Sequence, residues 1–99
     1  MQSTKSRISR CLIIWVMKDK KPLESVVQSR IIARYEKAGY LVVKMILTNK
    51  NGIPDLLCLK DGKALFVEVK RKGCKPRPLQ EYRMQELRQK GFECIVLDE

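Results

Sequence analysis

The pattern of apolar and polar positions predicts two helices. In residues 23–38, apolar side chains recur three and four positions apart, as they do on one face of a helix: Val26, Val27, Ile31 and Tyr35. Residues 79–90 resume a helical pattern after a segment that contains two prolines. Gly39 and Gly91 follow these segments directly, and glycine is common just beyond the last turn of a helix. We therefore predict one helix in each segment.

Four short apolar runs predict strands. Residues 41–47, 55–59, 64–70 and 93–97 are rich in Val, Ile and Leu. Asp61-Gly62 separates the second run from the third, and this dipeptide is a strong signal for a tight hairpin. The resulting order of helix, three strands, helix and strand predicts a layered α/β fold.

A chain of 99 residues has room for one modest core, which we assign to residues 21–99. We expect residues 1–20 to be an N-terminal extension, either a strand or poorly ordered. Their apolar run, residues 11–17, is too short to span a bilayer, and charged residues follow where a signal peptide would be cleaved. We therefore expect a cytoplasmic protein that does not associate with a membrane.

The charge balance points to a polyanionic partner. Lys and Arg number 21 against 11 Asp and Glu, which gives a net charge of +10. Basic composition alone is also compatible with a merely soluble basic protein. Clustering favours nucleic acid, because five of the residues from 70 to 77 are cationic: Lys70, Arg71, Lys72, Lys75 and Arg77.

The residue types that are absent narrow the possible chemistry. The chain has no histidine, and its four cysteines form no C-x-x-C pair, so a zinc site of the usual Cys/His type is disfavoured. Without histidine, the Ser-His and Cys-His nucleophile schemes are excluded as well. Any catalysis must rest on carboxylates, lysines or a metal ion.

The predicted hairpin brings two carboxylates together. With a two-residue turn at Asp61-Gly62, residues 60 and 63 pair, and the pairing continued outward sets Asp55 opposite Glu68. Opposed side chains share a face of the sheet, about 4.5–5.5 Å apart at Cβ. Lys70 lies two residues beyond Glu68 and points to the same face. A turn longer by one residue would disturb this pairing.

Such a neighbourhood favours a divalent cation. Two close carboxylates repel unless a cation joins them, and oxygen ligands favour Mg²⁺ first and Mn²⁺ second. Taken singly, Asp55 could be a turn residue, and Glu68 and Lys70 could line the solvated face of an edge strand. The apolar runs around them favour a site, because charged residues that end buried strands are costly unless they bind a ligand.

These residues also resemble a known family. Gly52-Ile53-Pro54-Asp55 followed by Glu68-Val69-Lys70 looks like the PD-(D/E)xK nuclease signature. More narrowly, residues 23–97 are similar to the VRR-NUC family of virus-type replication-repair nucleases, because Glu24 and the run KPRPLQ at residues 75–80 match as well. The resemblance implies a restriction-endonuclease-like core with a mixed central sheet flanked by helices.

The resemblance also implies roles for individual residues. Those expected to act in catalysis are Asp55, Glu68, Lys70 and Gln80. Those expected to hold or orient a metal ion are Glu24, Asp55, Glu68 and the carbonyl group of Val69. The basic segment is expected to contact DNA phosphates through Arg71, Lys72, Lys75 and Arg77. Glu24 and Gln80 also have ordinary explanations, an acidic residue in a helix's first turn and a polar helix start.

The stand-alone phage and bacterial members that the chain resembles imply a specific activity. They imply a magnesium-dependent endonuclease that works as a homodimer on branched DNA, such as the Holliday junction, with no small-molecule cofactor. Two alternatives remain open. One is a flap or non-specific DNA nuclease of the same fold, and the other is a DNA-binding module without catalysis.

Overall fold

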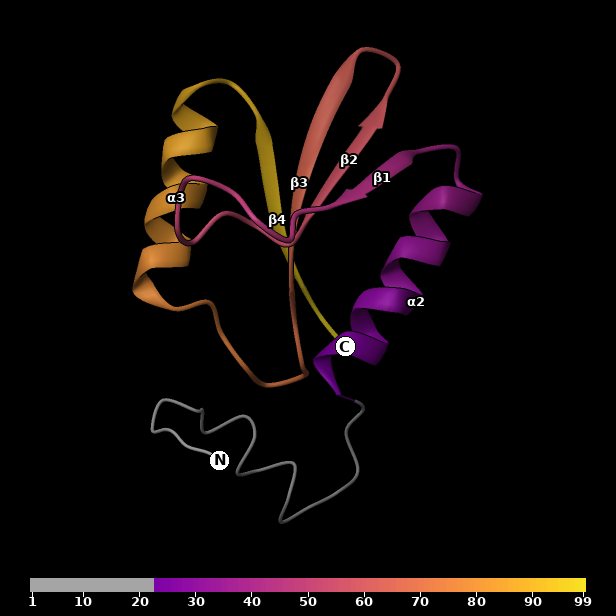
Figure 1. Ribbon diagram of the computed structural model, residues 1–99, viewed down its shortest axis with the longest axis horizontal. Helices are drawn as coiled ribbons and strands as arrows, with labels where there is room; N and C mark the ends of the chain where they lie inside the picture. The colour runs from indigo at the N-terminus through magenta and orange to yellow at the C-terminus, as the bar shows by residue number, and fades with distance from the viewer. Residues whose placement is uncertain (1–22) are drawn as a thin grey trace.

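The computed structural model describes residues 23–99, and the expected N-terminal extension lies outside them (Figure 1). Two helices and four strands follow one another in the predicted order. They are α2 (Glu24–Lys37), β1 (Leu41–Lys44), β2 (Leu56–Lys60), β3 (Lys63–Lys70), α3 (Pro78–Gln89) and β4 (Glu93–Asp98). In the described part of the chain, no helix is long and apolar enough to cross a membrane.

The sheet is mixed, as expected. Its strand order is β1-β2-β3-β4, with β1 and β3 both antiparallel to β2. β4 runs parallel to β3, and parallel strands need a long crossover connection, which α3 supplies. The two helices lie on either side of the sheet (Figure 1). The α/β class and the restriction-endonuclease-like order of elements are confirmed.

The hairpin has the predicted register. Lys60 pairs with Lys63, and the ladder continues to Leu56 opposite Val67. Asp61 and Gly62 both have positive φ, +52° and +75°, as a two-residue turn of this hand requires. One further step along the same register sets residue 55 opposite residue 68.

The main core lies between α2 and one face of the sheet. It consists of Val27, Ile31, Leu56, Cys58, Val67 and Val69. On α2, the buried face is shifted from the predicted one, because Val26 is exposed whereas Gln28 is buried. Pro54, Met84 of α3 and Cys94 of β4 are also buried, outside this cluster.

β1 is shorter than predicted, since it ends at Lys44 instead of residue 47. Its partner β2 begins at Leu56, directly opposite Lys44. One more main-chain bond joins the Met45 N–H to the Asp55 carbonyl, at 2.8 Å. Beyond it the chain leaves the sheet, so Ile46 belongs to the connecting loop.

Candidate active site

The site lies where the start of β2, the end of β3 and the first turn of α2 come together, at the lower edge of the sheet in Figure 1. Asp55 directly precedes β2 and is held from two sides. Its carbonyl accepts the N–H of Met45 at 2.8 Å, and its carboxylate oxygen Oδ2 accepts the N–H of Val69 at 2.9 Å. Asp55 is therefore fixed to both neighbouring strands.

Glu68 carries a buried carboxylate. Its side chain is 1% exposed, and neither Oε1 nor Oε2 has a hydrogen-bond partner among the described residues. The Nζ of Lys70 lies 3.5 Å from Oε2, which is an ion pair too long for a strong hydrogen bond. Buried polar atoms are almost always hydrogen-bonded, so these oxygens are suited to bind a ligand.

The acidic groups influence one another's pKa. The pKa of Glu68 is raised to about 7, mainly by burial and in addition by Asp55, whereas the ammonium of Lys70 opposes the shift. Burial also raises the pKa of Asp55, against the opposing effects of the Val69 N–H, Lys70 and Lys44. Mutual effects of this kind mean that the charges lie close together in a poorly solvated place.

The alternation of side chains along β3 sets the direction of the cluster. Val67 and Val69 pack in the core beneath α2, so Glu68 and Lys70 point to the opposite face. That is the face on which α3 and the β1–β2 loop lie (Figure 1). The structure thus brings Asp55, Glu68 and Lys70 together as the hairpin predicted.

Glu24 acts on this cluster from α2. Burial raises its pKa most, Lys70 lowers it and Asp55 raises it. Within residues 23–99, however, no three Asp, Glu, Cys or His side chains come close enough to hold a metal ion by themselves. Glu24, Asp55 and Glu68 therefore do not form a complete three-carboxylate cage.

Gln80 has a structural partner at the start of α3. Its Oε1 accepts the backbone N–H of Arg77 at 2.8 Å, which satisfies one of the unpaired donors at the helix N-terminus. No contact of Gln80 with Asp55 or Glu68 is observed in the described residues, and its catalytic role stays a prediction.

The loop that leads to Asp55 is anchored to α3. The Nε–H of Arg83 donates to the carbonyl of Asn51 at 2.7 Å, while Nη1 binds Glu86 Oε1 at 2.8 Å. Gly52 has φ +83°, and a Cβ there would lie 2.9 Å from the carbonyl oxygen and from Cγ of Leu79. Arg83 was missed from the sequence because its partner lies 32 positions away and no local pattern marks the contact.

A second residue missed from the sequence is Lys44, whose positive charge lowers the pKa of Asp55. A signal for it exists in retrospect. Lys44 ends β1 and pairs with Leu56, the neighbour of Asp55, so the β1–β2 register places it beside the site.

The cationic side chains that follow Lys70 differ in their exposure to solvent. Lys72, Lys75 and Arg77 are exposed, whereas Arg71 is buried. Arg77 and Arg71 both lower the pKa of Glu24, so the segment passes close to the carboxylates. The three exposed side chains are the ones that can reach a phosphate from the surface.

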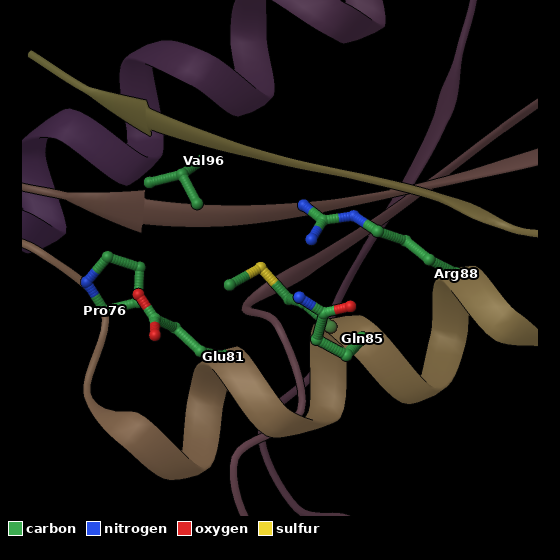
Figure 2. A pocket seen from close by; sticks show the side chains of 6 residues that line it. Pro76, Glu81, Gln85, Arg88 and Val96 are labelled. Atoms are coloured by element: carbon green, nitrogen blue, oxygen red, sulfur yellow. The ribbon is translucent and has the colours of Figure 1, made fainter.

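A pocket lies beside the cluster, between α3 and β4 (Figure 2). Val96 lines it and pairs with Glu68 across the parallel ladder, so the pocket opens on the same face of the sheet. Glu81 and Pro76 lie at one end and Arg88 at the other (Figure 2). Neither Asp55 nor Glu68 lines it, so the carboxylate cluster is a separate feature.

Comparison with known proteins shows which family the chain belongs to. The model of the VRR-NUC domain family matches residues 2–98. That match begins ahead of residue 21, and the expected domain boundary there stays a prediction. "Putative nuclease p44" of Acyrthosiphon pisum secondary endosymbiont phage 1 is 34% identical over 76 residues, covering 76% of this chain and 82% of that protein.

A solved structure of a VRR-NUC domain has the same fold. It superposes with a TM-score of 0.70 at 36% sequence identity, over 77% of this chain and 84% of that chain. Both the sequence match and the structural match cover most of the chain. The chain therefore belongs to the VRR-NUC family of nuclease domains.

Proposed function

We propose that the protein is a magnesium-dependent, structure-selective endonuclease that hydrolyses phosphodiester bonds in branched DNA, such as the Holliday junction. The observation that carries the proposal is the buried carboxylate of Glu68, which is influenced by the nearby Asp55. Within residues 23–99, neither of its oxygens has a hydrogen-bond partner. Membership of a nuclease family and the name of the phage relative support the nuclease activity in this proposal.

The donor set fits a hard divalent cation. Asp55 and Glu68 offer carboxylate oxygens in a cluster without His or Cys ligands, which suits Mg²⁺ and also Mn²⁺. The carbonyl of Val69 and the carboxylate of Glu24 are the further oxygen groups that would complete or orient the ligand shell. When bound, the cation supplies Lewis-acid polarisation of the scissile phosphate and a more acidic attacking water.

The chain's own residues have separate tasks. Asp55 is held in position by the Val69 N–H, so one carboxylate is oriented before DNA arrives. The ammonium of Lys70 lies beside Glu68 in a largely buried place, where a positive charge stabilises negative charge that develops on phosphorus or holds the attacking water. A low local dielectric strengthens both effects.

DNA is positioned by the exposed basic residues that follow β3: Lys72, Lys75 and Arg77. Contacts of this kind bind phosphates of any sequence and fix the register of the duplex, which suits an enzyme that selects shape. The net charge of +10 adds long-range attraction. Arg71, being buried, acts on the carboxylate cluster instead of the DNA surface.

A homodimer belongs to the proposal because a four-way junction has two equivalent strands to cut. Two active sites related by a twofold axis would nick them symmetrically. Sedimentation of the purified protein at several concentrations measures the assembly directly, and a mass of one chain throughout would remove this part of the proposal.

Cleavage of a substrate panel tests the proposal. The purified protein is incubated with a labelled four-way junction, a flap and a linear duplex, each with Mg²⁺, Mn²⁺ or EDTA. We expect metal-dependent cutting that is strongest on the junction. Preferred cutting of the flap, or equal cutting of all three, would favour a flap or non-specific nuclease.

Two substitutions separate catalysis from binding. Asp55→Ala and Lys70→Ala should each abolish cutting while DNA binding in EDTA survives. Asp61→Asn is the control, because Asp61 is an exposed carboxylate in the hairpin turn and asparagine tolerates its positive φ. Unchanged cutting by either site variant would contradict the assignment. If the unmodified protein binds DNA but cuts nothing with Mg²⁺ or Mn²⁺, the protein is a DNA-binding module without catalysis.

A further inference from the structure

The two most exposed large apolar side chains in residues 23–99 are neighbours in the sequence. Ile46 is 82% exposed and Leu47 is 92% exposed. They follow Met45 in the loop of residues 45–52, which leaves β1 and leads back toward Asp55 and β2. Adjacent aliphatic side chains held almost wholly in solvent are suited to contact a partner.

This loop is attached directly to the candidate active site. The N–H of Met45 donates to the carbonyl of Asp55 at 2.8 Å, and Lys44 lowers the pKa of Asp55. Consecutive Cα atoms are about 3.8 Å apart, so Ile46 and Leu47 lie only one and two such steps from Met45. A partner that covers them therefore lies close to Asp55 along the chain.

The far part of the loop is fixed by α3. Arg83 binds the carbonyl of Asn51, and Gly52 packs against Leu79 without room for a side chain. Figure 1 shows this loop extending from β1 toward α3 and back to β2. The two apolar residues thus project from a loop held at both ends, which suits rigid insertion into a partner.

The charges around the loop favour DNA as that partner. Lys44 and Lys50 flank the apolar pair and are both exposed, and the whole chain carries +10. A second copy of this chain would bring an equal positive charge against the same surface, which disfavours association there. DNA brings phosphates to the lysines, and at a branch point it also brings unstacked base faces.

We propose that Ile46 and Leu47 form an apolar wedge that packs against base faces exposed at a DNA branch point. Apolar wedges in other DNA-binding proteins insert between base steps, at an unstacking cost that is smallest where stacking is already interrupted. The wedge therefore favours branched over continuous DNA and sets the cut beside the branch. This inference rests on the proposed function and deepens it by naming how the structure of the substrate is recognised.

Fluorescence of 2-aminopurine tests the wedge independently of cutting. The base is placed at the branch point of a four-way junction or within a continuous duplex, and protein is added in EDTA. We expect the unmodified protein to increase the fluorescence at the branch point and to leave the duplex signal unchanged. The signal should be lost in Ile46→Ser/Leu47→Ser and retained in Leu47→Phe, which keeps an apolar side chain.

Affinity measured in the same buffer gives the magnitude. The double variant should bind the junction about tenfold more weakly, as expected for removing one well-buried aliphatic contact, and should bind the linear duplex as before. Leu41→Ser is the matched control, because Leu41 is 64% exposed at the other end of β1. Circular dichroism should be unchanged in all variants, since the substituted side chains lie in solvent.

Two results would overturn the wedge. One is unchanged junction affinity and an unchanged fluorescence signal in the double variant. The other is a fall in the sedimenting mass of the double variant, which would assign the apolar pair to contact between two copies of the chain. Both are read in EDTA, so a protein that cuts nothing with Mg²⁺ would overturn the proposed function and leave the wedge result readable.

Discussion

Glu68 is the residue that shows most clearly how function opposes stability here. A charged carboxylate with no hydrogen-bond partner is costly to bury, and the neighbouring Asp55 increases that cost. Lys70 offsets only part of it from 3.5 Å. A domain of this size has a small margin of stability. We therefore expect that a destabilising residue such as Glu68 is retained because it binds a ligand.

This cost predicts a dependence of stability on pH in the metal-free protein. The pKa of Glu68 is raised from 4.5 to about 7 in the folded state. A raised folded pKa contributes stability below pH 4.5 that is lost as the pH rises toward 7. In EDTA, the free energy of unfolding should therefore fall by roughly 2–3 kcal/mol across this window.

Glu68→Gln provides the comparison, because glutamine fits the same space and does not titrate. Urea unfolding at several pH values should show the variant gaining stability relative to the unmodified protein as the pH rises. Parallel curves for the two proteins would mean that Glu68 is not the titrating group.

The central residues of the site could be predicted from sequence because a two-residue turn fixes the register of a hairpin. Asp61-Gly62 determines which residues of β2 and β3 oppose one another, and Lys70 follows from the alternation of side chains. Arg83 and Lys44 could not be found in this way. Their effects on the site depend on how α3 and β1 pack, and no short spacing records that.

Among the elements, the contact between α3 and the 45–52 loop has the clearest consequence for the site. Arg83→Ala removes the hydrogen bond to the Asn51 carbonyl and should loosen the approach to Asp55. We expect weaker Mn²⁺ binding, measured by calorimetry, and slower cutting at saturating DNA, each by about tenfold, the change from losing roughly 1.4 kcal/mol of a charge-assisted hydrogen bond.

The control for this variant is Arg30→Ala, which removes the same charge from an exposed position on α2. Arg83→Lys keeps the charge but lacks the planar guanidinium, so it should restore little of the lost Mn²⁺ binding and cutting. Equal Mn²⁺ affinity in Arg83→Ala and Arg30→Ala would show that the contact does not position Asp55.

Gly52 and Gly62 form a matched pair within the β1–β2–β3 segment. Both have positive φ, but a Cβ at Gly52 would meet Leu79 at 2.9 Å, whereas no atom of the described residues lies within 4 Å of a Cβ at Gly62. Both alanine substitutions incur the strain of positive φ, about 1 kcal/mol or more. Gly52→Ala should destabilise the protein by a further 1–3 kcal/mol or so in urea unfolding, because backbone must move. Equal losses would contradict the close approach of the loop to α3.

Helices, strands and their order could be predicted from periodicity and from turn residues, but the lengths depend on partners. Residues 41–47 have the composition of one strand, yet β1 ends at Lys44 because β2 begins opposite it. Similarly, the burial of Gln28 on α2 reflects how the helix is rotated against the sheet. The spacing of apolar residues alone does not fix the rotation of α2 about its axis to within one residue.

At the scale of the whole molecule, positive charge should dominate DNA affinity. Each Lys or Arg that contacts a phosphate contributes about 1 to the slope of log affinity against log salt. Lys75→Ala should therefore lower the slope by about 1 on any DNA substrate. Lys63→Ala, at the start of β3 beside the hairpin turn, should leave the slope unchanged. The β2–β3 hairpin turn lies at the end of the sheet away from the segment that follows β3 (Figure 1). The same slope in both variants would show that residues 72–77 do not contact DNA phosphates.

The most direct test of the whole account is a titration of Mn²⁺ followed by electron paramagnetic resonance, with DNA absent. The unmodified protein should bind the ion, and Asp55→Asn and Glu68→Gln should each lose that binding. Asp61→Asn should bind as before, since Asp61 is an exposed turn residue whose positive φ suits asparagine as well. Undiminished Mn²⁺ binding by the Asp55 or Glu68 variant would contradict the claim that these two carboxylates share a metal ion.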